Sequence, residues 1–163
     1  MHYKLAFVIN DMNKIIKKKL NVRIIAMYKI VDLQTFLDPS GEITIANIYK
    51  TLNFTAKRCY WILNTNKDDS RGNHAHKNLK QLIVVSSGSV DILLDDGKNE
   101  AKVSLTSPHK GLFLEGLIWR KMFNFSTNCV ITILCDEDYN EDDYIRNYDD
   151  FLIYVKNIEN DHR

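Results

Sequence analysis

Residues 80–97, KQLIVVSSGSVDILLDDG, hold two short apolar stretches, 80–86 and 89–95, with a turn signal after each. Both stretches are rich in Val, Ile and Leu, and such runs between Ser- and Gly-containing turns are typical of β-strands. Asp96-Gly97 suits a tight hairpin, because both central positions of a type I′ turn need a positive φ. The stretch therefore predicts short strands joined by tight turns.

The same pattern continues through most of the chain. Turn signals occur at Pro39-Ser40-Gly41, Ser70-Arg71-Gly72-Asn73 and Ser107-Pro108. Many short strands at even spacing indicate a β-sandwich or barrel rather than a βαβ fold. The other candidate strands are 28–34, 43–49, 57–64, 73–77, 101–105, 111–115, 117–125 and 128–135.

The period changes to that of a helix near the C-terminus. Asp142-Asp143 can start a helix, because carboxylates favour the positive end of the helix dipole. We expect one helix that packs on the barrel, with a single apolar face formed by Tyr144, Ile145, Tyr148, Phe151, Leu152 and Val155.

The length of 163 residues and the hydrophobic content of 45% predict one domain with its own core, over residues 27–163. Residues 1–26 carry six lysines and arginines against one aspartate. We interpret them as a basic, weakly ordered N-terminal extension, in which 11–20 has the spacing of a short amphipathic helix. Met27 is an alternative natural start.

Composition and cysteine usage exclude several classes of protein. A net charge of +1 gives no reason to expect nucleic acid as a partner. No apolar run is long enough to span a membrane, and no signal peptide is evident. Cys59, Cys129 and Cys135 form no CxxC or zinc spacing, so we expect buried free thiols and a cytoplasmic location.

The most informative stretch for chemistry is residues 71–77, RGNHAHK. Alternate residues of a strand share a face, so His74 and His76 point the same way. Two imidazoles on one barrel wall are metal ligands, a pair of proton carriers or a surface pair. A metal site needs further ligands, and Arg120 and Lys121 would repel a divalent ion, so we predict no metal.

A second constellation is Lys57-Arg58-Cys59-Tyr60-Trp61. Arg58 and Tyr60 share one strand face. They would bind phosphate and donate a proton if that face met the histidines. The alternative is that Tyr60 and Trp61 are core aromatics, and we expect core packing for Trp61.

These stretches resemble a known family, the cupin-fold 3,4-ketoisomerases that act on dTDP-4-keto-6-deoxyglucose. The resemblance covers roughly residues 28–155. The RGxHAHK and DYIRxYDxF patterns are specific in combination. The matching pieces are 54–62, 71–77, Gln81, Gly88-Ser89, 95–97, 108–112, Trp119, Phe125-Ser126, 139–146 and 148–151.

The resemblance implies an all-β, cupin-type β-barrel (jelly roll) with a C-terminal helix. It implies an isomerase that moves the ketone from C4 to C3 of a dTDP-linked keto-sugar through an enediol, without metal or redox cofactor. The pathway would be dideoxy-aminosugar biosynthesis for a surface polysaccharide such as lipopolysaccharide O-antigen. The protein would be a homodimer that exchanges N-terminal strands.

The resemblance also assigns roles to individual residues. His74, His76 and Tyr60 would be catalytic. The basic residues around them would bind the substrate, namely Arg58, Arg71, Lys77 and Arg120.

Two positions depart from the family pattern. Ser40 stands where relatives have an arginine before the glycine of the early turn, and Arg120 follows Trp119 where they tend to have His or Glu. We interpret Arg120 either as a replacement for the missing positive charge or as a solvated residue at a strand end.

Three other functions remain open. One is a non-catalytic cupin that binds sugar nucleotides, which Ser40 favours. Another is a metal-dependent cupin, which the missing ligands disfavour. The third is a sugar epimerase, in which a histidine usually pairs with Asp and Tyr; the HAHK run speaks against it. The gluco or galacto configuration of the product depends on which face of C4 receives the proton.

Overall fold

The computed structural model describes residues 28–161. The predicted basic extension 1–26, its helix 11–20 and Met27 lie outside the described residues. The elements are β1 (Tyr28–Asp32), β2 (Gln34–Asp38), β3 (Gly41–Ile45), α2 (Ile48–Leu52), β4 (Arg58–Ile62), β5 (Arg71–His76), β6 (Gln81–Ser87), β7 (Val90–Asp95), β8 (Glu100–Leu105), β9 (Lys110–Leu114), β10 (Trp119–Phe123), β11 (Val130–Cys135), η1 (Glu141–Asp143), β12 (Tyr144–Ile145) and α3 (Tyr148–Asp161).

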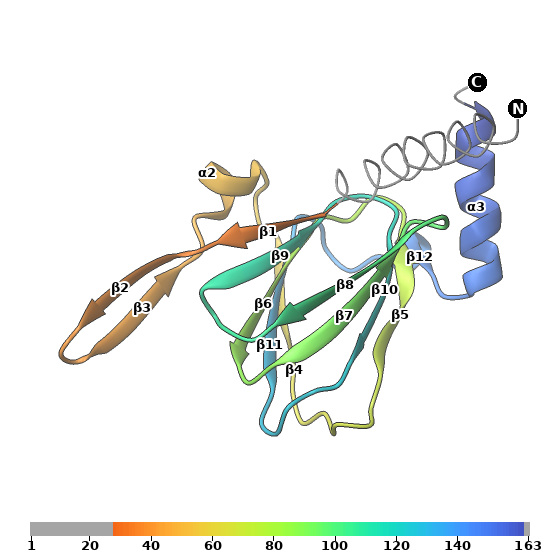
Figure 1. The fold of residues 1–163 in the computed structure, drawn as a ribbon. Coiled ribbons are helices and arrows are strands. Elements are labelled where there is room, and N and C mark those ends of the chain that lie inside the picture. The colour runs from red at the N-terminus through yellow and green to blue at the C-terminus, as the bar shows by residue number, and fades with distance from the viewer. Residues whose placement is uncertain (1–27, 162–163) are drawn as a thin grey trace, which may run out of the picture.

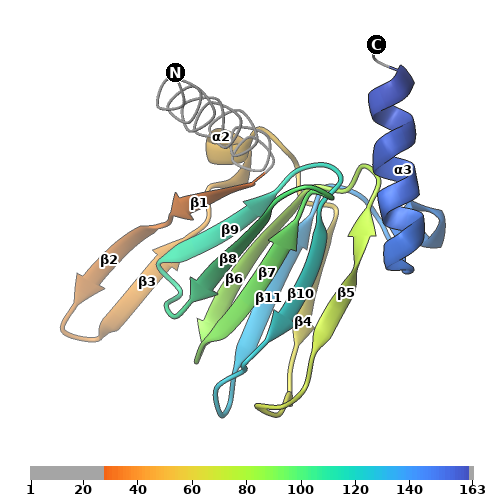
Figure 2. The same cartoon turned by 45° about the vertical axis from the view of Figure 1, so that its right-hand side comes forward.

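Two antiparallel five-stranded sheets form the body of the molecule (Figures 1 and 2). One has the order β1-β9-β6-β11-β4 and the other β12-β5-β10-β7-β8. The expected all-β jelly roll of cupin type with a C-terminal helix is confirmed, as two facing sheets rather than one closed barrel. Within residues 28–161, no helix has the length and apolar character needed to cross a membrane.

The core lies between the two sheets and follows the strand alternation. Every second residue of β6, β7 and β11 points inward, as Ile83, Ile92 and Ile131 do, and each of these three is fully buried. Burying a side chain of this size stabilises the fold by roughly 1.5–3 kcal/mol. The interior also holds His76, Gln81 and Arg120, which are at most 2% exposed. Polar and charged side chains therefore lie between the two sheets, inside the body that we call the barrel.

The structure confirms the hairpin between β7 and β8, but the prediction of a two-residue type I′ turn at Asp96-Gly97 is wrong. Of its loop residues only Gly97 has a positive φ, of 86°. The Asp96 carboxylate instead accepts hydrogen bonds from the backbone N–H groups of Lys98 and Asn99, at 2.9 and 2.8 Å. A wider loop results, because the aspartate side chain replaces the backbone of a tight turn.

The predicted start of the C-terminal helix at Asp142-Asp143 is wrong. Tyr144–Ile145 pairs with β5 as the short strand β12. The helix α3 begins at Tyr148, where the Asn147 side chain accepts from the N–H groups of Asp149 and Asp150. An asparagine at this place satisfies N–H groups that have no partner within the helix.

Other local expectations also need correction. The candidate strand 43–49 ends at Ile45 and gives way to α2, and the strand β2 was not expected. Cys129 and Cys135 are buried as predicted, whereas Cys59 is exposed. Trp61 is 58% exposed rather than packed in the core, because it lies on the outward face of β4 at the edge of its sheet.

The hairpin β2–β3 stands apart from the two sheets and projects from the barrel (Figure 1). Phe36 and Ile43 are register partners on it and are 52% and 61% exposed. Ser40 lies in its exposed turn and donates both backbone and side-chain hydrogen bonds to Asp38. The hairpin thus presents an apolar surface that the rest of residues 28–161 leaves exposed.

Candidate active site

The strand β5 places His74 and His76 on one face, toward the barrel interior. Their ring centroids are 4.9 Å apart and the rings meet edge to face. His76 is 1% exposed and His74 is half-buried beside a cavity. The sequence prediction that the two imidazoles share a face agrees with this geometry.

Each ring is held by its Nδ1 atom. His76 Nδ1 lies 2.9 Å from Asp143 Oδ2, and His74 Nδ1 lies 2.9 Å from the carbonyl oxygen of Gly72. A carboxylate and a carbonyl only accept, so in both neutral rings Nδ1 carries the proton and Nε2 keeps its lone pair. His76 Nε2 is buried and has no hydrogen-bond partner among residues 28–161. The arrangement therefore presents two basic nitrogen atoms.

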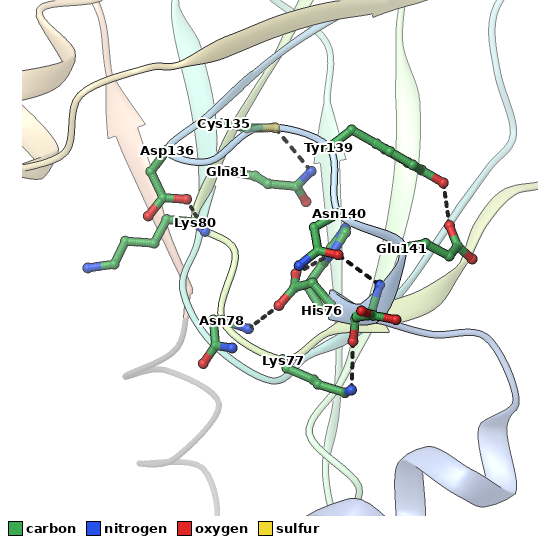
Figure 3. A network of polar contacts seen from close by, with 12 residues as sticks. His76, Lys77, Asn78, Lys80, Gln81, Cys135, Asp136, Tyr139, Asn140 and Glu141 are labelled. Atoms are coloured by element: carbon green, nitrogen blue, oxygen red, sulfur yellow. Dashed lines mark hydrogen bonds and ion pairs between the residues drawn. The ribbon is translucent and has the colours of Figure 1, made fainter.

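Figure 3 shows the polar network around His76, Lys77 and Asn78. Asp143 contacts all three of these residues. Its Oδ1 accepts from the backbone N–H of Asn78 at 2.9 Å, and its carbonyl accepts from the N–H of Lys77 at 2.9 Å. Sequence reasoning missed this role, because Asp142-Asp143 has the composition of a helix start. His76 and Asp143 form a His–Asp pair of the kind that we associated with epimerases. Because this pair is present beside the HAHK run, it does not distinguish an epimerase from a ketoisomerase.

Both histidines are held neutral. Burial, reinforced by the nearby Arg120 guanidinium, lowers the pKa of His74 to about 4 and that of His76 to about 2. Both effects disfavour an additional positive charge, whereas the Asp143 carboxylate at Nδ1 of His76 favours one there. At neutral pH each ring is unprotonated and keeps a lone pair for a proton.

Tyr60 supplies a protonated hydroxyl on the facing sheet. Gln81 Nε2 donates a hydrogen bond to its oxygen at 3.1 Å, which leaves the phenolic proton free for another acceptor. Burial raises the pKa of Tyr60 to about 12. The residue therefore acts as a hydrogen-bond donor at neutral pH rather than as a base.

Arg120 lies inside the barrel, and the expectation of a solvated residue at a strand end is wrong. It is 1% exposed and stands opposite His74 in the β10–β5 register. Burial lowers its pKa to about 10, so it remains a cation at neutral pH. Its side chain points inward because the alternation of β10 buries Arg120 together with Met122.

A cavity of about 680 Å³ opens beside His74. Arg58, Arg71 and Arg146 line it, so three positive charges belong to its lining. Tyr60 and the exposed ring of Trp61 also line it. Anions with aromatic substituents fit such a lining, because guanidinium groups bind phosphate in a bidentate manner and aromatic faces stack on bases.

The ring of Tyr144 covers both histidines, with centroid distances of 5.0 Å to His74 and 4.2 Å to His76. Arg146 stacks on this ring at 4.2 Å and pairs with Glu141 through two hydrogen bonds of 2.7 and 2.9 Å. Sequence reasoning placed Tyr144 on the apolar face of the C-terminal helix, whereas it lies in β12, and it assigned no active-site role to Tyr144 or Arg146. Only their place in the DYIRxYDxF pattern pointed to them.

The predicted site residues do not all come together. Arg58, Tyr60, Arg71 and His74 line one cavity. His76 lines a second cavity of about 290 Å³, which shares Arg58 and Tyr144 with the first, and Arg120 is buried and lines neither. Lys77 points elsewhere: its Nζ donates to the Asp142 carbonyl at 2.6 Å and lies over the Tyr154 ring of α3. Residues 28–161 contain no group of three or more His, Cys, Asp or Glu side chains able to hold a metal ion.

Comparisons with known proteins point to one family. The family model described as FdtA (WxcM-like, C-terminal) matches residues 26–156. A curated TDP-4-oxo-6-deoxy-alpha-D-glucose-3,4-oxoisomerase from Aneurinibacillus thermoaerophilus is 37% identical over 130 residues, which is 80% of this chain and 94% of the relative.

Solved structures agree with that match. A 3,4-ketoisomerase from Helicobacter canadensis is 40% identical, with a TM-score of 0.77 over 79% of this chain and 97% of that chain. A sugar 3,4-ketoisomerase from Thermoanaerobacterium thermosaccharolyticum in complex with TDP is 35% identical, with a TM-score of 0.79 over 82% and 97%.

Proposed function

The chain belongs to the FdtA family (WxcM-like, C-terminal), and from this premise we propose that it is a sugar-nucleotide 3,4-ketoisomerase acting on dTDP-4-keto-6-deoxyglucose. The observation that carries the proposal is the pair of neutral histidines, His74 and His76, whose Nδ1 atoms are both engaged and which line two adjoining cavities that share Arg58 and Tyr144. The names of the relatives supply the substrate class.

The reaction needs only proton transfers. A histidine Nε2 takes the proton from C3, the C–H electrons form a C3=C4 double bond, and the C4 carbonyl oxygen becomes an enediolate oxygen. The hydroxyl proton on O3 is then lost, C3 becomes the ketone, and C4 and O4 each gain a proton. No electron acceptor enters the balance, so we propose that no redox cofactor is required. We also propose that no metal is required, because His74 and His76 have too few further ligands among residues 28–161 to hold one.

His74 and His76 share these transfers. Their ring centroids are 4.9 Å apart, which matches a shift between adjacent sugar carbons. General acid–base catalysis of this kind contributes about 10²–10⁴-fold to the rate. Tyr60, which keeps its proton, can donate a hydrogen bond to a sugar oxygen.

The lining of the cavity beside His74 suits the nucleotide. We assign the diphosphate to Arg58 and Arg71, which line the cavity together with Tyr60 and His74. The exposed ring of Trp61 offers a face for thymine. Lys77 has no part in this assignment, because its ammonium group is held against Asp142 and Tyr154.

The apolar hairpin β2–β3 supports a homodimer that exchanges this element. Phe36, Leu37 and Ile43 are all more than half exposed on it. An apolar hairpin that forms its own two-stranded sheet, and that the other described residues leave exposed, is a natural pairing surface. Ser40, in the turn of this hairpin, would then approach the cavity of the partner rather than that of its own chain.

The cellular setting follows from the substrate. A dTDP-keto-sugar is a cytoplasmic intermediate, and the two buried free thiols fit a reducing compartment. A 3-keto product is ready for transamination, which places the step before an aminotransferase in dideoxy-aminosugar synthesis for a surface polysaccharide.

The test is to mix the purified protein with dTDP-4-keto-6-deoxyglucose and follow the sugar protons by NMR, with and without prior EDTA treatment. We expect conversion to the 3-keto isomer in both samples. If TDP binds but the sugar is unchanged, the alternative of a non-catalytic sugar-nucleotide-binding cupin is correct. If EDTA abolishes turnover and a divalent ion restores it, the metal-free mechanism is wrong.

A further inference from the structure

The guanidinium of Arg120 is a buried cation without a hydrogen-bond partner. Its Nε, Nη1 and Nη2 atoms are all buried, and none of them has an acceptor among the described residues. The carboxylate of Asp143 contributes to its electrostatic environment but is engaged by His76 and Asn78. Five N–H groups thus face the barrel interior with no acceptor in that part of the chain.

Such an arrangement is costly for the protein alone. Burying a charge without a partner disfavours the folded state by several kcal/mol, even after relaxation. The cost is offset when an anion enters the site, because a desolvated guanidinium binds an anion more strongly than a hydrated one does. The buried guanidinium of Arg120 is therefore suited to bind a negatively charged group of a ligand.

The backbone of β5 and β10 allows Arg120 to lie opposite His74 in the interior. Gly72 on β5 has a φ of 82°, and a Cβ at this position would lie 2.8 Å from the carbonyl oxygen of Arg120. The β10–β5 pairing also shifts register between Arg120 and Lys121. The glycine therefore permits a close approach of the two strands where Arg120 stands opposite His74.

The position of Arg120 decides which negative charge it meets. Arg120 stands opposite His74 in the β10–β5 register, and its positive charge lowers the pKa of both His74 and His76. Arg58, Arg71 and Arg146 instead line the cavity. If the histidines reach C3 and C4 of the sugar, the group next to Arg120 is the sugar, not the diphosphate. The sugar is neutral in the ground state and gains a negative charge on oxygen when the C3 proton leaves.

We propose that Arg120 is a catalytic residue that stabilises the enediolate by hydrogen bonding to the oxygen on which the negative charge develops. This inference rests on the proposed function. A cation that meets charge only in the transition state lowers the activation barrier without tightening substrate binding. Losing one such donor costs about 10²–10³-fold in kcat.

The test compares Arg120→Gln and Arg120→Lys with the control Lys121→Gln, an exposed cation one residue further along β10. We expect Arg120→Gln to lower kcat by about 10²–10³-fold while KM and the Kd for TDP change little. Arg120→Lys, which keeps the charge, should recover part of the loss. Lys121→Gln should behave as wild type.

Two further readouts separate catalysis from a structural role. Without the guanidinium the histidines lose a neighbouring positive charge, so the acidic limb of the pH–rate profile should move to higher pH in Arg120→Gln. The melting temperature of Arg120→Gln should equal or exceed that of wild type, because the substitution removes an unpaired buried charge.

The inference is overturned if Arg120→Gln keeps its kcat, loses mainly TDP affinity, or unfolds at a much lower temperature. A wild-type protein that binds TDP but does not isomerise the sugar would instead refute the proposed function itself. The two failures are therefore distinguishable.

Discussion

His76 Nδ1 and Asp143 Oδ2 lie 2.9 Å apart, although 67 positions separate the two residues in the sequence. The contact fixes the tautomer of His76, so that Nε2 holds a lone pair inside the barrel. It also ties the segment after β11 to the end of β5, since Asp143 accepts from Asn78 as well. The Asp143 carboxylate thus holds two segments of the fold together and also orients a proposed catalytic histidine.

We predict that Asp143→Asn lowers kcat by about 10²–10⁴-fold, the range of a lost general base. An amide can donate to Nδ1 and so place the proton on Nε2, which removes the base. The control is Asp142→Asn, because Asp142 is exposed and its backbone carbonyl, not its side chain, holds Lys77. Equal activity of the two variants in the NMR assay would remove Asp143 from the mechanism.

The substitutions His74→Asn and His76→Asn should each lower turnover by about 10²–10⁴-fold. Asparagine is polar and of similar size, but it cannot carry a proton at neutral pH. The thermal transition should remain cooperative in both variants. Full activity in either one would exclude that histidine, and a collapsed transition would show that its role is structural.

The depressed pKa values of the histidines predict a pH profile of kcat/KM with its acidic limb well below 6.5, the ordinary histidine pKa. Nε2 must be unprotonated to accept a proton, and the pKa is about 4 for His74 and about 2 for His76. An acidic limb at or above 6.5 would contradict the electrostatic account of the site.

The same groups make folding stability depend on pH. Below pH 6.5, His74 and His76 bind protons in the unfolded chain but stay neutral in the folded protein. The free energy of unfolding therefore decreases as the pH falls from 6.5 toward 4. Chemical denaturation at several pH values should show this slope, and His76→Asn should reduce it. An unchanged slope in that variant would show that His76 is not held neutral.

We predict that the protein is a dimer and that the double substitution Phe36→Glu and Ile43→Lys makes it a monomer. The opposite charges keep the cross-strand pair compatible with the hairpin but abolish its apolar face. Light scattering at micromolar concentration measures the state. Ile153→Glu, at a residue 55% exposed on α3, is the matched control. A wild-type monomer, or a double variant that still dimerises, would contradict the proposal.

Most of the fold could be predicted from the sequence, because a strand period of two residues is visible locally. The shared face of His74 and His76 and that of Arg58 and Tyr60 follow from this alternation alone. The helix start could not be predicted, since Tyr144-Ile145 fits both a helix face and a strand. Pairing with β5 decides between them, and this contact is distant in the sequence.

The rest of the site depends on contacts of the same kind. Asp143 meets His76 only because the segment after β11 returns across the end of the barrel. Arg120 looked like a solvated strand-end residue, because a charged side chain in a short strand usually faces water. Its burial is set by the register of β10 against β5 and β7, which no local pattern records.

The central claim is that this chain moves a ketone from C4 to C3 with the two histidines of β5. The most direct measurement uses dTDP-4-keto-6-deoxyglucose labelled with ¹³C at C4 and follows the carbon spectrum with wild-type protein and the His74→Asn/His76→Asn double variant. We predict that the labelled ketone signal is replaced by that of a C4 alcohol with wild type and persists with the variant. A ketone signal that persists with wild-type protein, under conditions where TDP is shown to bind, would contradict the account.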